Sequence, residues 1–230
     1  MEGCVLRADE LLWLFELCLD AEYVSVEESG SFCLERKGDI LYVLFEKSNG
    51  VRDWENNLDF ASVVHTSSNK NDKIAVAAYS DMDEKWYCHG GFLRVWKSVL
   101  PYIEGALLDL EIRRIYCVGY SHGAALALLC HEYLWYNRQD IRESTFSFGF
   151  GCPRVIYGSV PREKERWANF YVIRNLDDIV THLPLRILGY RHVGNLVEIG
   201  RRGSYSKIEA HMAENYILSL RREIENSHIT

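Results

Sequence analysis

A serine, a carboxylate and a histidine follow one another along this sequence in an order that suits acyl transfer. The serine is Ser121, at the centre of Gly119-Tyr-Ser-His-Gly123, with a β-type run before it and a run of helical composition after it. In such a strand, turn and helix, the serine hydroxyl stands above the edge of a sheet, and the flanking glycines let neighbouring backbone pass closely. Because a serine hydroxyl is a weak nucleophile at neutral pH, it also needs a base to take its proton. Ser121 is therefore the predicted nucleophile.

His211 is the predicted base. Four histidines follow the region that carries the candidate acids. His182 lies on the same loop as those acids, His192 opens a strand, and His228 lies among the last residues, where chains fray. His211 comes just after the last predicted strand, at the head of the last predicted helix. Its imidazole can then reach over Ser121 while the helix holds its backbone.

Two adjacent aspartates are candidates for the acid that orients the base. Asp177 and Asp178 both lie on the loop after a predicted strand at residues 170–173. Composition does not separate the two. One of them is expected to be a solvated loop charge or an Asx-turn residue.

The tetrahedral intermediate of an ester needs two hydrogen-bond donors for its oxyanion, each worth about 3 kcal/mol. One predicted donor is the backbone N–H of His122, the residue after the nucleophile. The other is expected in the loop after an early strand. The apolar run that ends at Phe45 places Lys47 and Ser48 there.

The elements that must position these residues alternate between strands and helices. A helix is predicted where Leu11, Leu14, Phe15 and Cys18 follow helical spacing. A long helix over residues 91–110 contains Pro101, which is expected to kink or divide it. Alternating strands and helices indicate a mostly parallel sheet with helices on both faces. The remaining predictions are strands at 31–36, 39–45, 115–120, 145–150 and 170–173, a hairpin-like strand at 193–199, two weaker strands near 60–64 and 74–78, and helices at 124–134 and 208–224.

Composition bounds the kind of protein. The chain has 230 residues, 48% of them hydrophobic and only 4 of them proline, which is typical of a folded globule and argues against disorder. We expect a single domain over residues 1–230, with an N-terminal helix and hairpin over about residues 1–38 and a core over about residues 39–224. The net charge of −7 disfavours nucleic acid as a partner.

Cysteine usage and the N-terminal residues suggest a compartment. The 7 cysteines are scattered singly with no C-x-x-C pair, which favours packed thiols over disulfides or a zinc site. The first residues carry acids and no cationic stretch, so they do not resemble a secretory signal. No apolar run reaches the ~18 residues of a membrane span. These observations predict a cytoplasmic protein without a metal, cofactor or transmembrane segment.

Several ordered motifs resemble the class 3, or fungal-type, lipase family of α/β hydrolases, which cleave carboxylic esters of glycerides and related lipids. The resemblance covers about residues 39–217 and implies the α/β-hydrolase fold. It selects Asp178 over Asp177, because residues 175–184 are similar to the family's N-x-x-D-x-V-x-x-L-P. The other similar segments are residues 43–58 (F-R-G-T…D-W…N-L), 89–92 (H-x-G-F), 119–123 (G-H-S-L-G), 151–155 (G-x-P-R-V) and 211–216 (H-x-x-x-x-Y).

The resemblance also assigns an oxyanion residue and a lid. It places Ser48 at the family's oxyanion hydroxyl position, preceded by Glu46 and Lys47 instead of Arg-Gly, while His122 replaces the usual leucine. The lid segment would be residues 49–58, which is short and polar and implies weak interfacial activation with a preference for dispersed or short-chain esters. Its residues expected to contact lipid are Val51, Trp54 and Leu58.

Two hypotheses follow for the function. The first is a serine hydrolase that cleaves lipid or small esters through Ser121, His211 and Asp178, with transient contact to a lipid surface and no cofactor. The second is a lipase-like protein that binds a ligand or partner without turnover, which the unusual Lys47 and His122 motivate. A complete triad in the expected order favours the enzyme.

Overall fold

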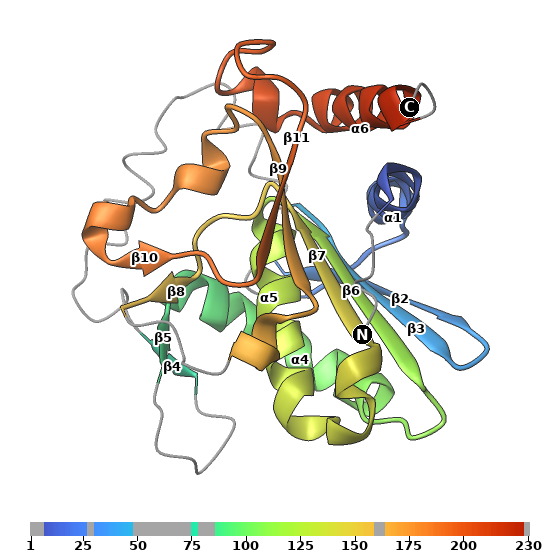
Figure 1. The fold of residues 1–230 in the computed structure, drawn as a ribbon. Helices are drawn as coiled ribbons and strands as arrows, with labels where there is room; N and C mark the ends of the chain where they lie inside the picture. Colours follow the sequence, from blue (N-terminus) through green and yellow to red (C-terminus); the bar gives the residue numbers. More distant parts are fainter. Residues whose placement is uncertain (1–6, 27–29, 48–74, 78–85, 159–163, 228–230) are drawn as a thin grey trace.

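A seven-stranded sheet with the order β1-β2-β3-β6-β7-β9-β11 organises the computed structural model, which describes residues 7–26, 30–47, 75–77, 86–158 and 164–227 (Figure 1). The five strands from β3 to β11 are parallel, and β1 and β2 extend the sheet in antiparallel fashion. The strands are β1 (Val24–Ser25), β2 (Ser31–Lys37), β3 (Ile40–Phe45), β6 (Arg114–Tyr120), β7 (Thr145–Phe150), β9 (Phe170–Asn175) and β11 (Asn195–Ile199). The predicted fold class, a mostly parallel sheet covered by helices, is confirmed.

Two pairs of helices cover the two faces of this sheet (Figure 1). On one face lie α4 (Gly90–Leu107) and α5 (His122–Asn137), and their apolar side chains form one core with residues of β3 and β6. On the other face α1 (Ala8–Asp20) packs beside α6 (Ala213–Ser227) and forms a second core. The consecutive residues 123–134 of α5 are all buried, as expected of an Ala- and Leu-rich helix enclosed on every side. The sheet thus separates two apolar layers.

Three expectations about the elements were inaccurate. The strand at residues 193–199 does not form a hairpin: β11 pairs in parallel with β9, with Asn195 opposite Tyr171, because the long intervening loop returns the chain to the starting edge of the sheet. Pro101 does not divide α4, which ends at Leu107 instead of the predicted residue 110. The last helix begins at Ala213, after a separate 3₁₀ turn η6 (Glu209–His211), because Met212 is extended with ψ 141°.

A second, smaller sheet has the order β10-β8-β5-β4 and lies beside the main one (Figure 1). Its strands are β4 (Ala75–Ala77), β5 (Trp86–Cys88), β8 (Ile156–Tyr157) and β10 (Tyr190–Arg191). β4 falls within the weak prediction near residues 74–78, whereas the one near residues 60–64 lies outside the described residues. Within the part of the chain that the structure describes, no helix is both long and apolar enough to cross a membrane.

Candidate active site

Ser121 occupies a strained turn between β6 and α5. Its φ of 57° and ψ of −118° lie in a region that non-glycine residues rarely adopt, so the surrounding structure must hold it there. A Cβ at Gly119 would lie 2.1 Å from the carbonyl oxygen of Gly123, and a Cβ at Gly123 would lie 2.2 Å from that of Phe45. Both glycines are therefore required, because the serine turn folds back on itself and against the end of β3.

Hydrogen bonds join Ser121, His211 and Asp178 into one chain. His211 Nε2 lies 2.9 Å from Ser121 Oγ, and His211 Nδ1 lies 2.9 Å from Asp178 Oδ2. The carboxylate can only accept at Nδ1, so Nδ1 carries the proton and Nε2 is free to accept the serine proton. The side chains are nearly enclosed, with Ser121 1%, Asp178 0% and His211 7% exposed. The structure thus brings together the three residues predicted as nucleophile, acid and base.

Three donors hold the Asp178 carboxylate in place. Oδ2 accepts from His211 and from the hydroxyl of Tyr216, 2.5 Å away, and Oδ1 accepts from the backbone N–H of Val180 at 2.8 Å. Burial and the Asp178 charge raise the pKa of Tyr216 well above its ordinary value, so its hydroxyl remains a donor. The orientation of the acid is therefore over-determined.

Asp177, the other candidate acid, faces away from this chain of hydrogen bonds. Its φ is 73°, and its Oδ2 accepts a hydrogen bond of 2.5 Å from the N–H of Gly203. This bond ties the loop after β9 to the turn after β11. The geometry therefore distinguishes two neighbours that their composition alone leaves equivalent.

Tyr120 and Gly151 position His211, a role that the sequence does not indicate for either residue. The Tyr120 hydroxyl donates to the carbonyl of His211, and its ring centroid lies 5.2 Å from that of the imidazole. A Cβ at Gly151, which has φ 58°, would lie 2.8 Å from His211 Cε1. Asn175 adds a 2.9 Å hydrogen bond from its side-chain amide to the carbonyl of Ala210. Tyr120 meets His211 only because the fold brings these distant residues together, so no local sequence pattern indicates the contact.

His122 begins α5, so its backbone N–H is one of those at a helix start that lack an acceptor within the helix. Its half-buried imidazole packs against Phe92, with ring centroids 5.4 Å apart. Burial and the nearby His89 lower the pKa of His122 to about 4. The ring beside Ser121 is therefore neutral at neutral pH.

The predicted second oxyanion residue and the lid contacts, Ser48, Val51, Trp54 and Leu58, lie outside the described residues. Lys47 is described: its side chain is exposed, and its ammonium lies 6.0 Å from the centroid of the Tyr120 ring. This cation therefore packs on the residue that holds His211.

The adjacent residues Cys130 and His131 of α5 are packed side chains. Cys130 lies 3.5 Å from Cys117, sulfur to sulfur, in the core. His131 is buried, and its ring nitrogens lie 2.8 Å from the hydroxyl of Ser147 and from the carbonyl of Arg166. Within the described ranges, no three His, Cys, Asp or Glu side chains gather as metal ligands would.

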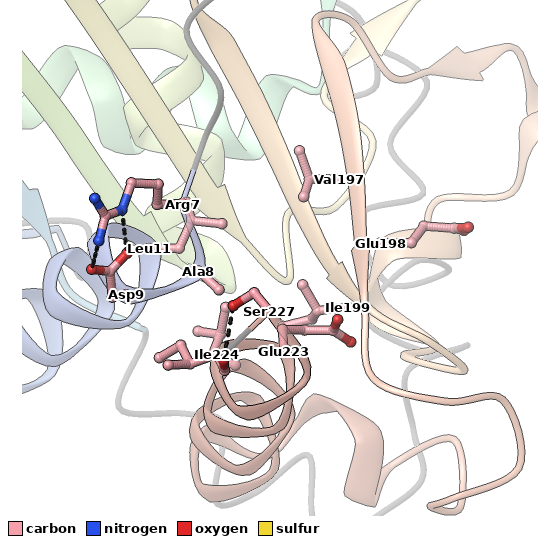
Figure 2. A pocket seen from close by; sticks show the side chains of 11 residues that line it. Arg7, Ala8, Asp9, Leu11, Val197, Glu198, Ile199, Glu223, Ile224 and Ser227 are labelled. Atoms are coloured by element: carbon pink, nitrogen blue, oxygen red, sulfur yellow. Dashed lines mark hydrogen bonds and ion pairs between the residues drawn. The ribbon is translucent and has the colours of Figure 1, made fainter. Parts of the chain in front are cut away.

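A pocket of about 510 Å³ lies between the start of α1, β11 and the end of α6 (Figure 2). Its walls include Leu11, Val197 and Ile224, with the carboxylate of Glu223 at the side. α6 begins beside His211, and the pocket lies along its second half, from Leu220 to Ser227, roughly 10–20 Å along the helix axis at 1.5 Å per residue. This pocket is therefore separate from the serine site.

A mostly parallel sheet whose central strand runs through a strained serine turn into a buried helix defines the α/β-hydrolase class. Within that class, the chain belongs to the class 3 lipase family, whose model matches residues 42–187. The structure is similar to a fungal lipase in an inhibitor complex, with a TM-score of 0.66 at 17% identity over 91% of this chain and 94% of that chain. The Rhizomucor miehei lipase propeptide complex has a TM-score of 0.60 at 19% identity, over 87% of this chain and 68% of that chain.

Curated relatives are also fungal lipases. The chain is 26% identical to the lipase of Rhizomucor miehei over 167 residues, which are 67% of this chain and 40% of the relative. It is 26% identical to a secreted mono- and diacylglycerol lipase of Malassezia restricta, over 54% of this chain and 44% of the relative. A third match, secreted mono- and diacylglycerol lipase 1 of Fusarium solani, is 30% identical over 45% of this chain and 32% of the relative. The chain therefore spans less than half the length of these relatives.

The prediction of a cytoplasmic protein is wrong, because relatives of this chain are named as secreted lipases, which points to an extracellular location. Scattered cysteines misled the inference. The thiols of Cys18 and Cys88 are buried, and burial raises the pKa of each to about 12. Since the thiolate is the reactive form, such cysteines stay inert in either compartment and indicate neither.

Proposed function

We propose that this protein is a serine hydrolase that cleaves carboxylic esters of lipids. The observation that carries the proposal is the hydrogen-bonded chain from Ser121 through His211 to Asp178, mounted on a strained turn. The complete chain supports an enzyme over a binding protein without turnover, since ligand binding alone needs neither the strained serine nor the buried acid.

The proposed reaction has two acyl transfers. The Ser121 hydroxyl gives its proton to His211 Nε2 while its oxygen attacks the ester carbonyl carbon. The tetrahedral intermediate then collapses: the bond to the alkoxy oxygen breaks, and the imidazolium protonates the leaving alcohol. Water, deprotonated by the same imidazole, then attacks the acyl carbon. The bond from that carbon to Ser121 Oγ breaks, the imidazolium returns the proton to Oγ, and a carboxylic acid leaves. Asp178 stabilises the imidazolium in both halves, and no step requires a cofactor.

The developing oxyanion needs preorganised donors. The N–H of His122 is one, because it starts α5 with no acceptor in the helix and adds the positive end of the helix dipole. Ser48 remains the proposed second donor. Each donor contributes about 3 kcal/mol to stabilising the transition state.

The proposed substrates are mono- and diacylglycerols and related lipid esters. Family membership and the names of the Malassezia restricta and Fusarium solani relatives support this class. The enzyme would make transient contact with a lipid surface to reach them. We also infer one α/β-hydrolase domain, since the N-terminal strands β1 and β2 share the sheet that carries Ser121.

Covalent labelling with a fluorophosphonate tests the proposal. The protein should be modified at Ser121, and the label should disappear in Ser121→Ala. Hydrolysis of nitrophenyl esters from acetate to palmitate, beside a monoacylglycerol and a phospholipid, then defines the substrate class. A folded protein that is neither labelled nor active on any of these esters would refute the proposal.

A further inference from the structure

The 3₁₀ turn η5 (Arg186–Leu188) and the residue before it expose three large aliphatic side chains. Ile187 is 89% exposed, and Leu185 and Leu188 are each 50% exposed. Single exposed aliphatic residues are ordinary on protein surfaces, but three within four consecutive residues form an apolar cluster that needs an explanation. The turn lies beside β10 at the outer edge of the molecule (Figure 1).

The apolar cluster projects from a well-supported turn. The N–H of Leu188 donates to the carbonyl of Leu185 at 2.9 Å, and Arg191 donates to the carbonyl of Arg186 at 2.7 Å. The Arg154 guanidinium donates to the carbonyl of Pro184, just before the turn, at 3.0 Å. These bonds hold the backbone while the aliphatic side chains stay uncovered, so their exposure does not come from a frayed segment.

The surroundings of the turn are basic in an acidic protein. Arg186 lies in the turn itself, and the guanidinium of Arg191 donates to its carbonyl at 2.7 Å. Arg154 donates to the carbonyl of Pro184 at 3.0 Å, whereas the whole chain has a net charge of −7. Burial, together with Arg174, Arg186 and Arg191, lowers the pKa of Arg154. A local positive potential therefore surrounds the exposed aliphatic residues.

Ring contacts link the loop that carries η5 to the serine site. The ring of Tyr190, just after η5, lies 5.8 Å from that of His89, centroid to centroid. His89 packs on Phe92 with centroids 4.7 Å apart, and Phe92 packs on His122, the residue after Ser121, at 5.4 Å. The N–H of Ile179 donates to the carbonyl of Lys207 at 3.2 Å, which joins this loop to the loop that leads into η6. Beside His211, the residues on either side of η6 expose further apolar surface, with Ile208 39% and Met212 37% exposed.

We propose that the η5 turn anchors the protein to a lipid surface that carries anionic headgroups. Leu185, Ile187 and Leu188 enter the boundary between headgroups and acyl chains, and the surrounding cations meet the headgroups. The distant carboxylates that make the chain acidic act weakly here, since salt screens charges beyond about 8–10 Å. The anchor rests on the proposed function only for its purpose, which is to bring Ser121 to an ester in that surface.

Co-sedimentation with vesicles tests the anchor, using the full chain with Ser121→Ala so that no lipid is hydrolysed. One set of vesicles contains phosphatidylcholine alone, and the other also contains phosphatidylserine. Binding should favour the anionic set and weaken as salt rises. Adding Ile187→Ser should lower the partition coefficient about tenfold. Adding Arg186→Gln should lower it about fivefold on anionic vesicles only.

Matched controls lie at the opposite edge of the sheet. Leu110 is 69% exposed in the turn before β6, and Arg113 is exposed beside it, so Leu110→Ser and Arg113→Gln should not change binding. Absence of binding to both vesicle sets, equal binding to the two sets, or equal losses in the controls would each overturn the anchor. If the Ser121→Ala chain binds vesicles as expected but fluorophosphonate does not label the parent chain, the anchor is supported and the proposed hydrolase is rejected.

Discussion

Asp178→Asn should reduce kcat for ester hydrolysis by about three to four orders of magnitude. The magnitude follows from the donors around the carboxylate. Oδ2 accepts from His211 and from Tyr216, and Oδ1 accepts from the N–H of Val180. All three neighbours donate, so the amide group of asparagine meets a donor in either orientation.

With the amide at the Oδ2 position, His211 must turn its Nδ1 into an acceptor. Its proton then lies on Nε2, and the ring cannot take a proton from Ser121. With the amide at Oδ1, the N–H of Val180 loses its acceptor in a buried site, which costs about 1–3 kcal/mol of stability. The first arrangement removes the base and so lowers kcat, and the second lowers the stability of the loop that holds the acid.

Asp177→Asn is the matched control. The carbonyl of asparagine can still accept from the N–H of Gly203, and asparagine tolerates a φ of 73°. This variant should keep kcat within about twofold of the parent, because no reacting group depends on its charge.

The assay is steady-state hydrolysis of a soluble nitrophenyl ester, with thermal unfolding measured on both variants to show that they are folded. KM should change little in either, since the acid does not contact the substrate. Comparable losses in the two variants, or full activity in a folded Asp178→Asn, would refute the assignment of the acid.

Three further predictions concern stability. Tyr216→Phe removes a hydrogen bond to a buried carboxylate and should lower the unfolding free energy by about 2 kcal/mol, whereas Tyr102→Phe, at a 64% exposed site, should not; equal melting temperatures for the two variants would contradict this. Burial lowers the pKa of His131 to about 4, against about 6.5 in the unfolded chain. The stability that neutral His131 contributes is therefore fully present above pH 6.5 and declines toward pH 4. Denaturant titrations should show that the free energy of unfolding falls by at least about 2 kcal/mol from pH 8 to pH 5, and an unfolding free energy that does not change with pH would disprove this. Gly123→Ala should abolish soluble expression, because its Cβ would overlap backbone atoms. Gly105→Ala, with no atom within 4 Å of its Cβ, should stabilise α4 by up to about 1 kcal/mol. Equal soluble yields of the two variants would contradict the prediction for Gly123.

Hydrophobic periodicity predicted most helices and strands, because the pattern of buried residues is regular along each of them. The strand prediction at residues 145–150 coincides with β7, and the apolar run around residues 40–45 is β3, buried on both faces. A turn at Gly38 and Asp39 joins β2 to β3, with Gly38 at φ 65°. Such signals are local, so they can be read without knowledge of the partners.

The pairing of strands was less predictable than whether a segment forms a strand or a helix. Residues 193–199 alternate in the manner of a hairpin strand, yet β11 lies parallel to β9. The direction of a strand depends on the path of the preceding loop, which alternation does not encode. The structure of residues 209–213 shows the same limit: the break at Met212 leaves His211 in a separate turn whose carbonyl accepts from Tyr120.

The order of Ser121, Asp178 and His211, and the glycines around the serine, could be read from the sequence because each chemistry needs a particular residue type at a constrained spacing. Only the tertiary structure decided which atoms meet: that Tyr216 and Val180 complete the donors to the acid, that Tyr120 and Gly151 place the imidazole, and that Asp177 turns away. It also placed the aliphatic residues of η5 on the surface among cations. The physical reason is that a side chain's type sets the chemistry it can perform, whereas its neighbours come from segments tens of residues away and are set only when the sheet and its loops pack together.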